Sequence, residues 1–348
     1  MSADKFIVSW TADFYDSRGT CKYRDIGLSV LAEHPRILQQ VFKENRKQIG
    51  ADQIGGAQGV IVLTPAVTAE SVSKPDQLLV VARFGVGYDS VDVNACTAAG
   101  VLVTITTGAV DRPVAEAAIG WMIALSHNLL IKDKLARTGQ WDERSKYMGR
   151  ELRDRTLGVI GLGGIGRKTI ELLRGLGMKQ PLAFDPFVTA AMAAQAGARL
   201  VSLEELLREA DFVSIHCPLT EKTRGLIGAA QLALMKPEAY LLNTARGGIV
   251  EEDALYAALQ SRRIAGAALD CFAQEPLTAP SRFADLDNVL LAPHSIAWTD
   301  ELFRDIGRAA CQVMVDLALG VKPRGALNPE VFDQPSFQRK WQPFAQRR

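Results

Sequence analysis

Short runs of apolar and β-branched residues alternate with segments of helical periodicity along most of the chain. Runs of this length, bounded by turn residues, are typical of strands buried on both faces, and strands that alternate with helices build a parallel sheet. The chain is therefore predicted to be an α/β protein. The predicted strands are the amino-terminal segment 1–8 and the runs 59–63, 78–82, 157–161, 182–185, 212–216, 240–243 and 289–292.

A long apolar helix is predicted after residue 103. Pro113 lies in its first turn, where proline is tolerated, and the apolar residues continue to about residue 130. The apolar surface is continuous, which is more than a half-exposed helix needs. We expect this helix, 113–130, to connect two domains and to be covered in part by a second subunit of a homodimer. Burial in the core of its own chain is the alternative.

The length of the chain and its order of predicted strands and helices indicate two domains. A chain of 348 residues exceeds what one core usually supports. Strands and helices alternate without a break from 152 to 293, and the chain is then helical to about 319. We predict one domain at 105–298 and a second made of 1–104 and 299–348, with a cleft between them. The tail 333–348 shows no periodicity and is predicted to be a surface extension.

Composition excludes several kinds of partner. The 40 basic residues balance 39 acidic ones, so the net charge of +1 provides no field that attracts nucleic acid. The five cysteines form no CxxC pair, which is typical of reduced thiols. The amino terminus lacks the pattern of a signal peptide, and the longest apolar run, 117–125, is shorter than the roughly 18 residues of a membrane span. We expect a cytoplasmic protein without a membrane partner or a metal.

A glycine-rich turn, GLGGIG at 161–166, connects a predicted strand to a predicted helix. Gly161 permits a tight turn, Gly163 lets the backbone approach a pyrophosphate, and Gly166 lets the helix lie close to the sheet. The helix amino terminus then faces the anion. The order of strand, turn and helix makes this pattern more specific than isolated glycines, and it predicts a dinucleotide site.

Asp185 ends the strand that follows the glycine turn. A carboxylate at this position accepts hydrogen bonds from the hydroxyls of the adenosine ribose and repels a 2′-phosphate. Residues 186–189 contain no Arg or Lys that would attract that phosphate. The predicted cofactor is therefore NAD rather than NADP.

The chain has four histidines, and two of them follow predicted strands. His34 and His127 lie in helical or loop surroundings and are expected to be surface or packed residues. His216 ends a strand at the sheet edge where ligands bind, so we expect it to border the cofactor rather than to catalyse. His294 follows Pro293 at another strand end and is the candidate acid or base.

Six ordered motifs lie between 59 and 319: RFGVGYD (83–89), GLGGIG (161–166), HCPLT (216–220), NTARGG (243–248), AALD with EP (267–270, 275–276) and APH (292–294). Together they resemble the D-isomer-specific 2-hydroxyacid dehydrogenases, a family that includes phosphoglycerate, glycerate, hydroxypyruvate and D-lactate dehydrogenases. The resemblance implies a Rossmann-type NAD domain, a flavodoxin-like substrate domain, and interconversion of a D-2-hydroxy acid and its 2-keto acid.

The resemblance also implies a catalytic triad of Arg246, Glu275 and His294. The chemistry of each residue agrees with its role. The planar fork of Arg246 suits a carboxylate and a carbonyl oxygen. His294 would donate a proton to that oxygen, and Glu275 would orient the imidazole and favour its charged form.

By the same resemblance, further residues contact the cofactor and the substrate. Residues 83–87 are similar to the family's substrate loop, in which backbone amides reach a carboxylate. The expected cofactor contacts are Gly161, Gly163, Gly164, Ile165, Gly166, Asp185, His216, Cys217, Pro218, Thr223, Thr244, Ala245 and Asp270. The expected substrate contacts are Arg83, Gly85, Val86, Gly87, Arg246 and Trp298.

Two departures from the family pattern leave the substrate open. Phosphoglycerate-type members usually have Pro and Asn where this chain has Thr107 and Val110. After His294 the family often has a Gly-Gly pair, whereas this chain has Ser295-Ile-Ala-Trp298. Trp298 either shapes the substrate site or packs between domains. The particular acid, the physiological direction and the number of subunits do not follow from the sequence.

Three alternatives remain beside a general 2-hydroxyacid dehydrogenase. The first is phosphoglycerate dehydrogenase specifically. The second is an NAD-sensing interaction protein, because the C-terminal-binding-protein corepressors are similar to the same scaffold and keep the triad. The third is an enzyme acting on formate or phosphite; Glu275 argues against formate, since that branch has Gln at this position.

Overall fold

The computed structural model describes residues 5–345, so positions 1–4 of the first predicted strand and 346–348 of the tail lie outside the described residues. The chain divides into two compact units. The first consists of Met1–Val110 and Trp298–Arg348, and the second consists of Asp111–Ala297. The sequence placed the start of the second unit at 105 and its end at 298.

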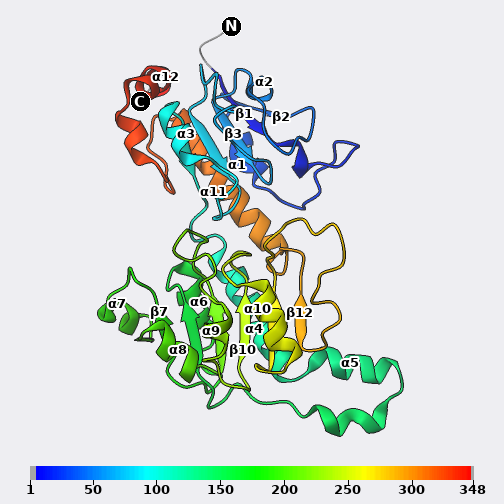
Figure 1. Cartoon of the computed structure of the whole chain (residues 1–348). Coiled ribbons are helices and arrows are strands. Elements are labelled where there is room, and N and C mark those ends of the chain that lie inside the picture. Colours follow the sequence, from blue (N-terminus) through cyan, green and yellow to red (C-terminus); the bar gives the residue numbers. More distant parts are fainter. Residues whose placement is uncertain (1–4, 346–348) are drawn as a thin grey trace. The chain divides into compact units, whose positions relative to one another are not determined.

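The first unit contains a five-stranded parallel sheet in the order β2-β1-β3-β4-β5 (Figure 1). This is the flavodoxin-like order, so the predicted sheet type is confirmed. The strands are β1 (Phe6–Trp10), β2 (Ile37–Val41), β3 (Gly59–Val62), β4 (Val80–Arg83) and β5 (Leu102–Thr104). The helices of this unit are η1 (Ala12–Phe14), α1 (Leu28–Ala32), α2 (Ala51–Ile54), α3 (Val93–Ala98), α11 (Asp300–Ala318), η3 (Pro329–Asp333) and α12 (Pro335–Ala345).

The carboxyl-terminal tail is a docked helix, α12, so the prediction of an extension without pattern is wrong for residues 335–345. Phe337 and Trp341 are buried one turn apart, and the ring of Phe344 lies 5.2 Å from that of Phe6. The indole N–H of Trp341 donates to the carbonyl of Leu317 at 2.9 Å. The apolar face at 337, 341 and 344 holds this helix on the unit.

Lys340 ties α12 to the edge of the sheet. Its Nζ donates to the carbonyl oxygens of Leu78 and Gly100, both at 2.7 Å, and more weakly to Pro75 at 3.3 Å. Burial lowers the pKa of Lys340 to about 8. One lysine therefore satisfies carbonyl groups from two separate loops.

The second unit contains a seven-stranded parallel sheet in the order β12-β11-β10-β9-β6-β7-β8 (Figure 1). The order reverses between β6 and β9, which is the switch point of a doubly wound Rossmann sheet, and this confirms the predicted class. The strands are β6 (Leu157–Ile160), β7 (Leu182–Phe184), β8 (Arg199–Leu200), β9 (Phe212–Ile215), β10 (Tyr240–Asn243), β11 (Gly266–Leu269) and β12 (Val289–Leu291). The helices are α4 (Asp111–Ser126), α5 (Leu129–Arg137), η2 (Trp141–Tyr147), α6 (Gly164–Leu172), α7 (Ala190–Gln195), α8 (Leu203–Glu209), α9 (Ala229–Leu232) and α10 (Glu252–Gln260).

The apolar helix predicted at 113–130 is shorter than expected. α4 has Pro113 in its first turn as predicted, but it ends at Ser126, because Asn128 adopts a left-handed φ of 53° before α5 begins. Trp121, Met122 and Leu125 are buried in one core cluster with residues of β6 and α6. The helix lies wholly within the second unit, and its own unit buries one of its faces.

Among the described residues, no single helix is long and apolar enough to cross a membrane. Only α4 and α5 taken together reach that length and composition, and they are bent by 60° at their junction.

Replacing Lys340 by Met should destabilise the first unit. The carbonyls of Leu78 and Gly100 would lose this donor, which costs about 1–3 kcal/mol in the free energy of unfolding. Because folding lowers the pKa of Lys340, wild-type stability should also rise as the pH increases from about 8 toward about 10.4, and the variant should lack that rise. Denaturant unfolding at several pH values measures both effects. The exposed Lys74→Met is the control, and equal losses in the two variants would contradict the proposed contribution.

Candidate active site

The glycine turn lies at the switch point of the second sheet, between β6 and α6. Gly161 has a φ of 95°, and a Cβ there would lie 2.7 Å from the backbone nitrogen of Cys217. A Cβ on Gly166 would overlap the carbonyl oxygen of Gly161. Both positions therefore require glycine. Gly163 caps the nine-residue helix α6, whose first N–H groups form an anion-binding end.

Asp185 follows β7 and contacts the same glycine turn. One carboxylate oxygen accepts the backbone N–H of Leu162 at 2.8 Å, and the other accepts that of Phe187 at 2.9 Å. The carboxylate is therefore fixed beside the glycine turn, on the strand that neighbours β6. This is where an adenosine ribose is expected in such a sheet.

Asp111 is a residue that the sequence reasoning missed. A Cβ on Gly164 would overlap the carboxylate of Asp111, so this acid occupies the space that a side chain at 164 would fill. Burial raises the pKa of Asp111, and the charge of Lys168 opposes that shift only in part. A carboxylate thus lies beside the first turn of α6. No local sequence pattern predicts that Asp111 lies beside Gly164, because 53 positions separate the two residues along the chain.

The loop after β10 carries Thr244, Ala245 and Arg246. Asn243 folds this loop back: its Oδ1 accepts the N–H of Ala245 at 3.1 Å, and its Nδ2 donates to the carbonyl of Arg246 at 2.8 Å. Nη1 of Arg246 donates to the carbonyl of Ala245 at 2.7 Å. Arg246 is therefore held at the carboxyl edge of the sheet.

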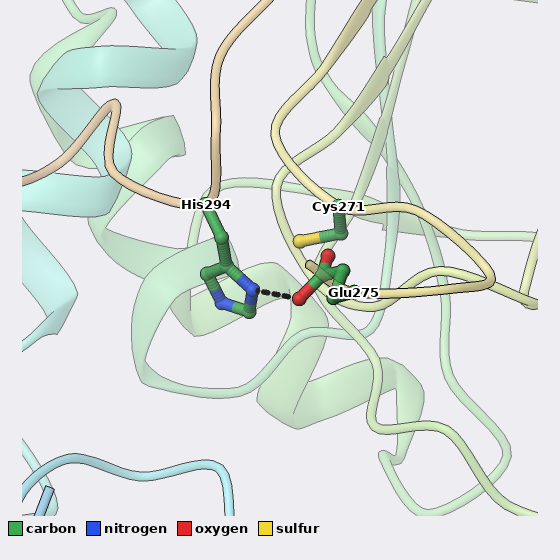
Figure 2. A group of neighbouring side chains, drawn as sticks. All are labelled: Cys271, Glu275 and His294. Atoms are coloured by element: carbon green, nitrogen blue, oxygen red, sulfur yellow. Dashed lines mark hydrogen bonds and ion pairs between the residues drawn. The ribbon is translucent and has the colours of Figure 1, made fainter. Parts of the chain in front are cut away.

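Glu275 and His294 form a hydrogen-bonded pair in the loops after β11 and β12 (Figure 2). Nδ1 of His294 lies 2.7 Å from Oε2 of Glu275, and the other oxygen of Glu275 accepts the N–H of Phe272 at 2.8 Å. Burial alone would raise the pKa of Glu275, but the hydrogen bonds from His294 and Phe272 and the charges of His294 and Arg246 outweigh it and hold this pKa below its usual value.

Asp270 fixes the backbone that carries the histidine. Its Oδ1 accepts the N–H groups of Ser295 and Ile296 at 2.8 and 3.1 Å. His294 itself has a φ of 52°, a conformation that a non-glycine residue adopts only when its surroundings hold it there. Burial raises the pKa of Asp270, while these backbone hydrogen bonds oppose the shift.

His216 is buried directly after β9. Its Nε2 lies 2.9 Å from Oγ of Ser214, and burial lowers the pKa of this imidazole to about 4. The imidazole is therefore uncharged at neutral pH. The loop that follows is closed by Thr223, whose hydroxyl donates to the carbonyl of Pro218 at 2.7 Å.

Two buried polar atoms at the ends of neighbouring strands fit a polar ligand. Nδ1 of His216 and Oγ1 of Thr244 have no hydrogen-bond partner within the described part of the chain. Buried polar groups without a protein partner usually bind water or a ligand. With the glycine turn and Asp185, these atoms form a row that fits a dinucleotide.

The predicted substrate loop belongs to the first unit. It follows β4, and Gly85 has a φ of 136°. The guanidinium of Arg83 hydrogen-bonds the carbonyl of Phe84, and the N–H of Gly85 donates to the carbonyl of Arg83 at 2.9 Å. The Gly85 amide, expected to hold a carboxylate, is thus already used within the turn, whereas the roles of Val86 and Gly87 stay predictions.

Trp298 begins the second segment of the first unit and contacts aromatic rings of that unit. Its ring centroid lies 5.1 Å from that of Phe303 and 6.0 Å from that of Tyr23, and these last two rings are stacked at 3.9 Å. About half of its surface stays exposed, with a relative accessibility of 51%.

Comparison with known proteins identifies the family of this chain. Residues 119–295 match the model of the NAD-binding domain of D-isomer specific 2-hydroxyacid dehydrogenases. The chain belongs to this family. It is 34% identical over 321 residues to the glyoxylate reductase of Korarchaeum cryptofilum, an alignment that covers 90% of this chain and 96% of that protein.

Other family members match in part or in fold. The D-3-phosphoglycerate dehydrogenase of Synechocystis is 40% identical over 262 residues, which cover 75% of this chain and 47% of that protein. The chain spans about half the length of the phosphoglycerate dehydrogenases that it matches. The solved D-lactate dehydrogenase of Aquifex aeolicus, complexed with NAD and lactic acid, has a TM-score of 0.76 at 27% identity and covers 89% of this chain and 94% of its own.

Replacing Asp111 by Asn should tighten NADH binding to this NAD-binding domain. The carboxylate beside the first turn of α6 opposes a pyrophosphate, so its removal should lower the Kd for NADH at neutral pH by about three- to tenfold. Because burial raises the pKa of Asp111, its charge is lost at a higher pH than that of an ordinary aspartate as the pH falls. Wild-type affinity should therefore rise as the pH falls, and it should rise more than that of the variant.

NADH fluorescence titrations at several pH values between neutral and acidic measure the effect. Asp142→Asn, which removes an exposed acid of the same unit, is the matched control. Identical pH dependence in the wild type and Asp111→Asn would show that this carboxylate does not influence the cofactor.

Proposed function

We propose that the protein is an NAD-dependent oxidoreductase that interconverts a D-2-hydroxy acid and its 2-keto acid. The observation that carries this proposal is the 2.7 Å hydrogen bond between His294 and Glu275, at the edge of an NAD-binding sheet and within the electrostatic influence of Arg246. A histidine oriented by a carboxylate is the arrangement that general acid and base catalysis needs.

Each residue of the triad has a distinct task. Arg246, always charged, binds the substrate carboxylate and carbonyl oxygen and so orients the carbon that is reduced. Bound NADH supplies the hydride. His294 donates the proton that the developing alkoxide requires, and it accepts that proton in the reverse direction.

Glu275 acts through the histidine. Because its pKa is held below the usual value, it stays ionised at neutral pH and orients the imidazole beside it. Its second oxygen is occupied by the N–H of Phe272, which fixes the direction of the carboxylate.

NAD is the cofactor that we propose rather than NADP. Asp185 is fixed beside the glycine turn, and residues 186–189 supply no basic side chain to a 2′-phosphate. Gly161, Gly163, Gly164, Ile165 and Gly166 would approach the pyrophosphate, while His216, Thr244 and Asp270 would lie along the remainder of the cofactor.

The particular 2-hydroxy acid follows from neither the triad nor the cofactor site. Relatives carry the names glyoxylate reductase and D-3-phosphoglycerate dehydrogenase. Thr107 and Val110 depart from the phosphoglycerate pattern.

Replacing His294 by Ala should abolish most ketone reduction while NADH still binds. Loss of the general acid is expected to lower kcat by about two to four orders of magnitude. NADH oxidation should be followed with a panel of glyoxylate, pyruvate, hydroxypyruvate and larger 2-keto acids, with His34→Ala as the control. Activity in the variant would remove His294 from the mechanism. Failure of the wild type with every acid would favour the NAD-sensing alternative.

We further propose that the chain forms a homodimer through the segment from α4 to η2. Apolar side chains on this segment are exposed: Leu130 is 60% accessible, Trp141 64% and Met148 78%. α5 and η2 project away from the sheet of their unit (Figure 1). A second copy of the same segment would bury these side chains, as closed symmetric dimers do.

The double replacement Leu130→Glu with Trp141→Glu should produce a monomer. Charged side chains cannot be buried in the apolar contact without a large desolvation cost. Light scattering after size exclusion gives the mass directly, and the exposed Phe187→Glu serves as control on another surface. A wild-type protein that is already monomeric at micromolar concentration would contradict the proposal.

A further inference from the structure

A third side chain joins the catalytic pair (Figure 2). The thiol of Cys271 lies beside Glu275 and His294, and one ligand atom from each of the three residues lies within 4.8 Å of the others. Cys271 and Glu275 come from the same loop after β11, and His294 comes from the loop after β12. Within the described part of the chain, these three form the group of His, Cys, Asp or Glu side chains whose ligand atoms lie close enough to hold a cation.

All three side chains are already oriented by other contacts. The thiol of Cys271 donates to the carbonyl of Ala245 at 3.3 Å, and Phe272 holds one oxygen of Glu275 at 2.8 Å. The backbone of His294 is fixed in a left-handed conformation. Binding a cation here would therefore cost little ordering of side chains, since preorganised ligands have lost that freedom on folding.

The donor set selects one class of cation. Sulfur, imidazole nitrogen and carboxylate oxygen are the ligands of Zn²⁺ and related borderline-soft cations, whereas Mg²⁺ and Ca²⁺ prefer oxygen alone. Metal–ligand distances of about 2.0–2.3 Å would require movements on the order of 1 Å, which side-chain rotations can supply.

The exposure of these side chains is compatible with a cation site. The side chains of His294 and Glu275 are 45% and 33% exposed, so a cation reaches them from solvent, whereas Cys271 is buried at 3%. Three protein ligands would leave a fourth position of a tetrahedral ion for water.

We propose that Cys271, Glu275 and His294 bind Zn²⁺ or a cation of the same class, and that this binding inhibits the enzyme. The inhibitory effect rests on the function proposed above. The cation would replace the thiol proton of Cys271, released to solvent, and the proton held between His294 and Glu275. His294 would keep only the Nε2 proton of a neutral, metal-bound imidazole, which is too weak an acid to protonate the substrate readily, and no residue changes its oxidation state.

Direct binding can be tested without any substrate. Co²⁺ replaces Zn²⁺ in such sites, and a cobalt–thiolate bond gives a charge-transfer absorption in the near ultraviolet. The wild-type protein titrated with Co²⁺ should show this band, and Cys271→Ser should not. Cys21→Ser removes a thiol of the first unit that belongs to no such group among the described residues, so it should keep the band. Absence of the band in the wild type would overturn the proposal.

Inhibition is measured separately. Zn²⁺ should inhibit reduction of a 2-keto acid, Mg²⁺ at the same concentration should not, and EDTA should restore activity. In Cys271→Ser the Zn²⁺ concentration for half inhibition should rise about tenfold or more, because one strong ligand is lost. Equal sensitivity in the wild type and Cys271→Ser would overturn the proposal. If no 2-keto acid is reduced at all, the proposed function fails, and the cobalt titration still decides whether the site exists.

Discussion

The parallel register of the second sheet is the constraint on which the site depends. Ile160, Ile215, Asn243 and Leu269 are directly paired across β6, β9, β10 and β11, and Leu269 is paired with Leu291 of β12. Five strands therefore end in one row, and the residue after each end faces the same edge. The glycine turn, His216, Thr244, Asp270 and the loop of His294 follow these ends. A shift of register by one residue would turn alternate side chains to the opposite face of the sheet.

The sequence predicted the strands that are rich in branched residues and missed those with weaker signals. β6 and β9 were found because large apolar residues predominate in both, and both are fully buried in the structure. β11 has the sequence GAAL, whose small residues carry no strand preference, and its pairing with β10 and β12 makes it a strand. β2 was missed for another reason: four of its five residues are exposed, as an edge strand allows. The spacing at 337, 341 and 344 carried a helical signal for α12 that the prolines obscured.

The proposed catalytic pair followed from motifs, whereas the positions of Asp111 and Cys271 did not. His294 and Glu275 were predicted to interact, and the hydrogen bond between them is present. Asp111 lies beside Gly164 only because α4 packs on α6, and that arrangement is a property of the fold. Cys271 likewise has no motif of its own, and only the loops after β11 and β12 bring its thiol to the pair. Local patterns identify a reaction more readily than the side chains that surround it.

The carboxyl-terminal segment has a consequence for the order of folding. Asn328 accepts the N–H of Val103 at 2.8 Å and donates to the carbonyl of Val101 at 3.0 Å, and Lys340 binds carbonyls near β4 and β5. These contacts join residues more than 220 positions apart along the chain. The second unit is continuous in sequence and can fold as it leaves the ribosome, because domains generally fold as units. The first unit, although it is begun earlier, has to wait for the last fifty residues before its sheet is covered.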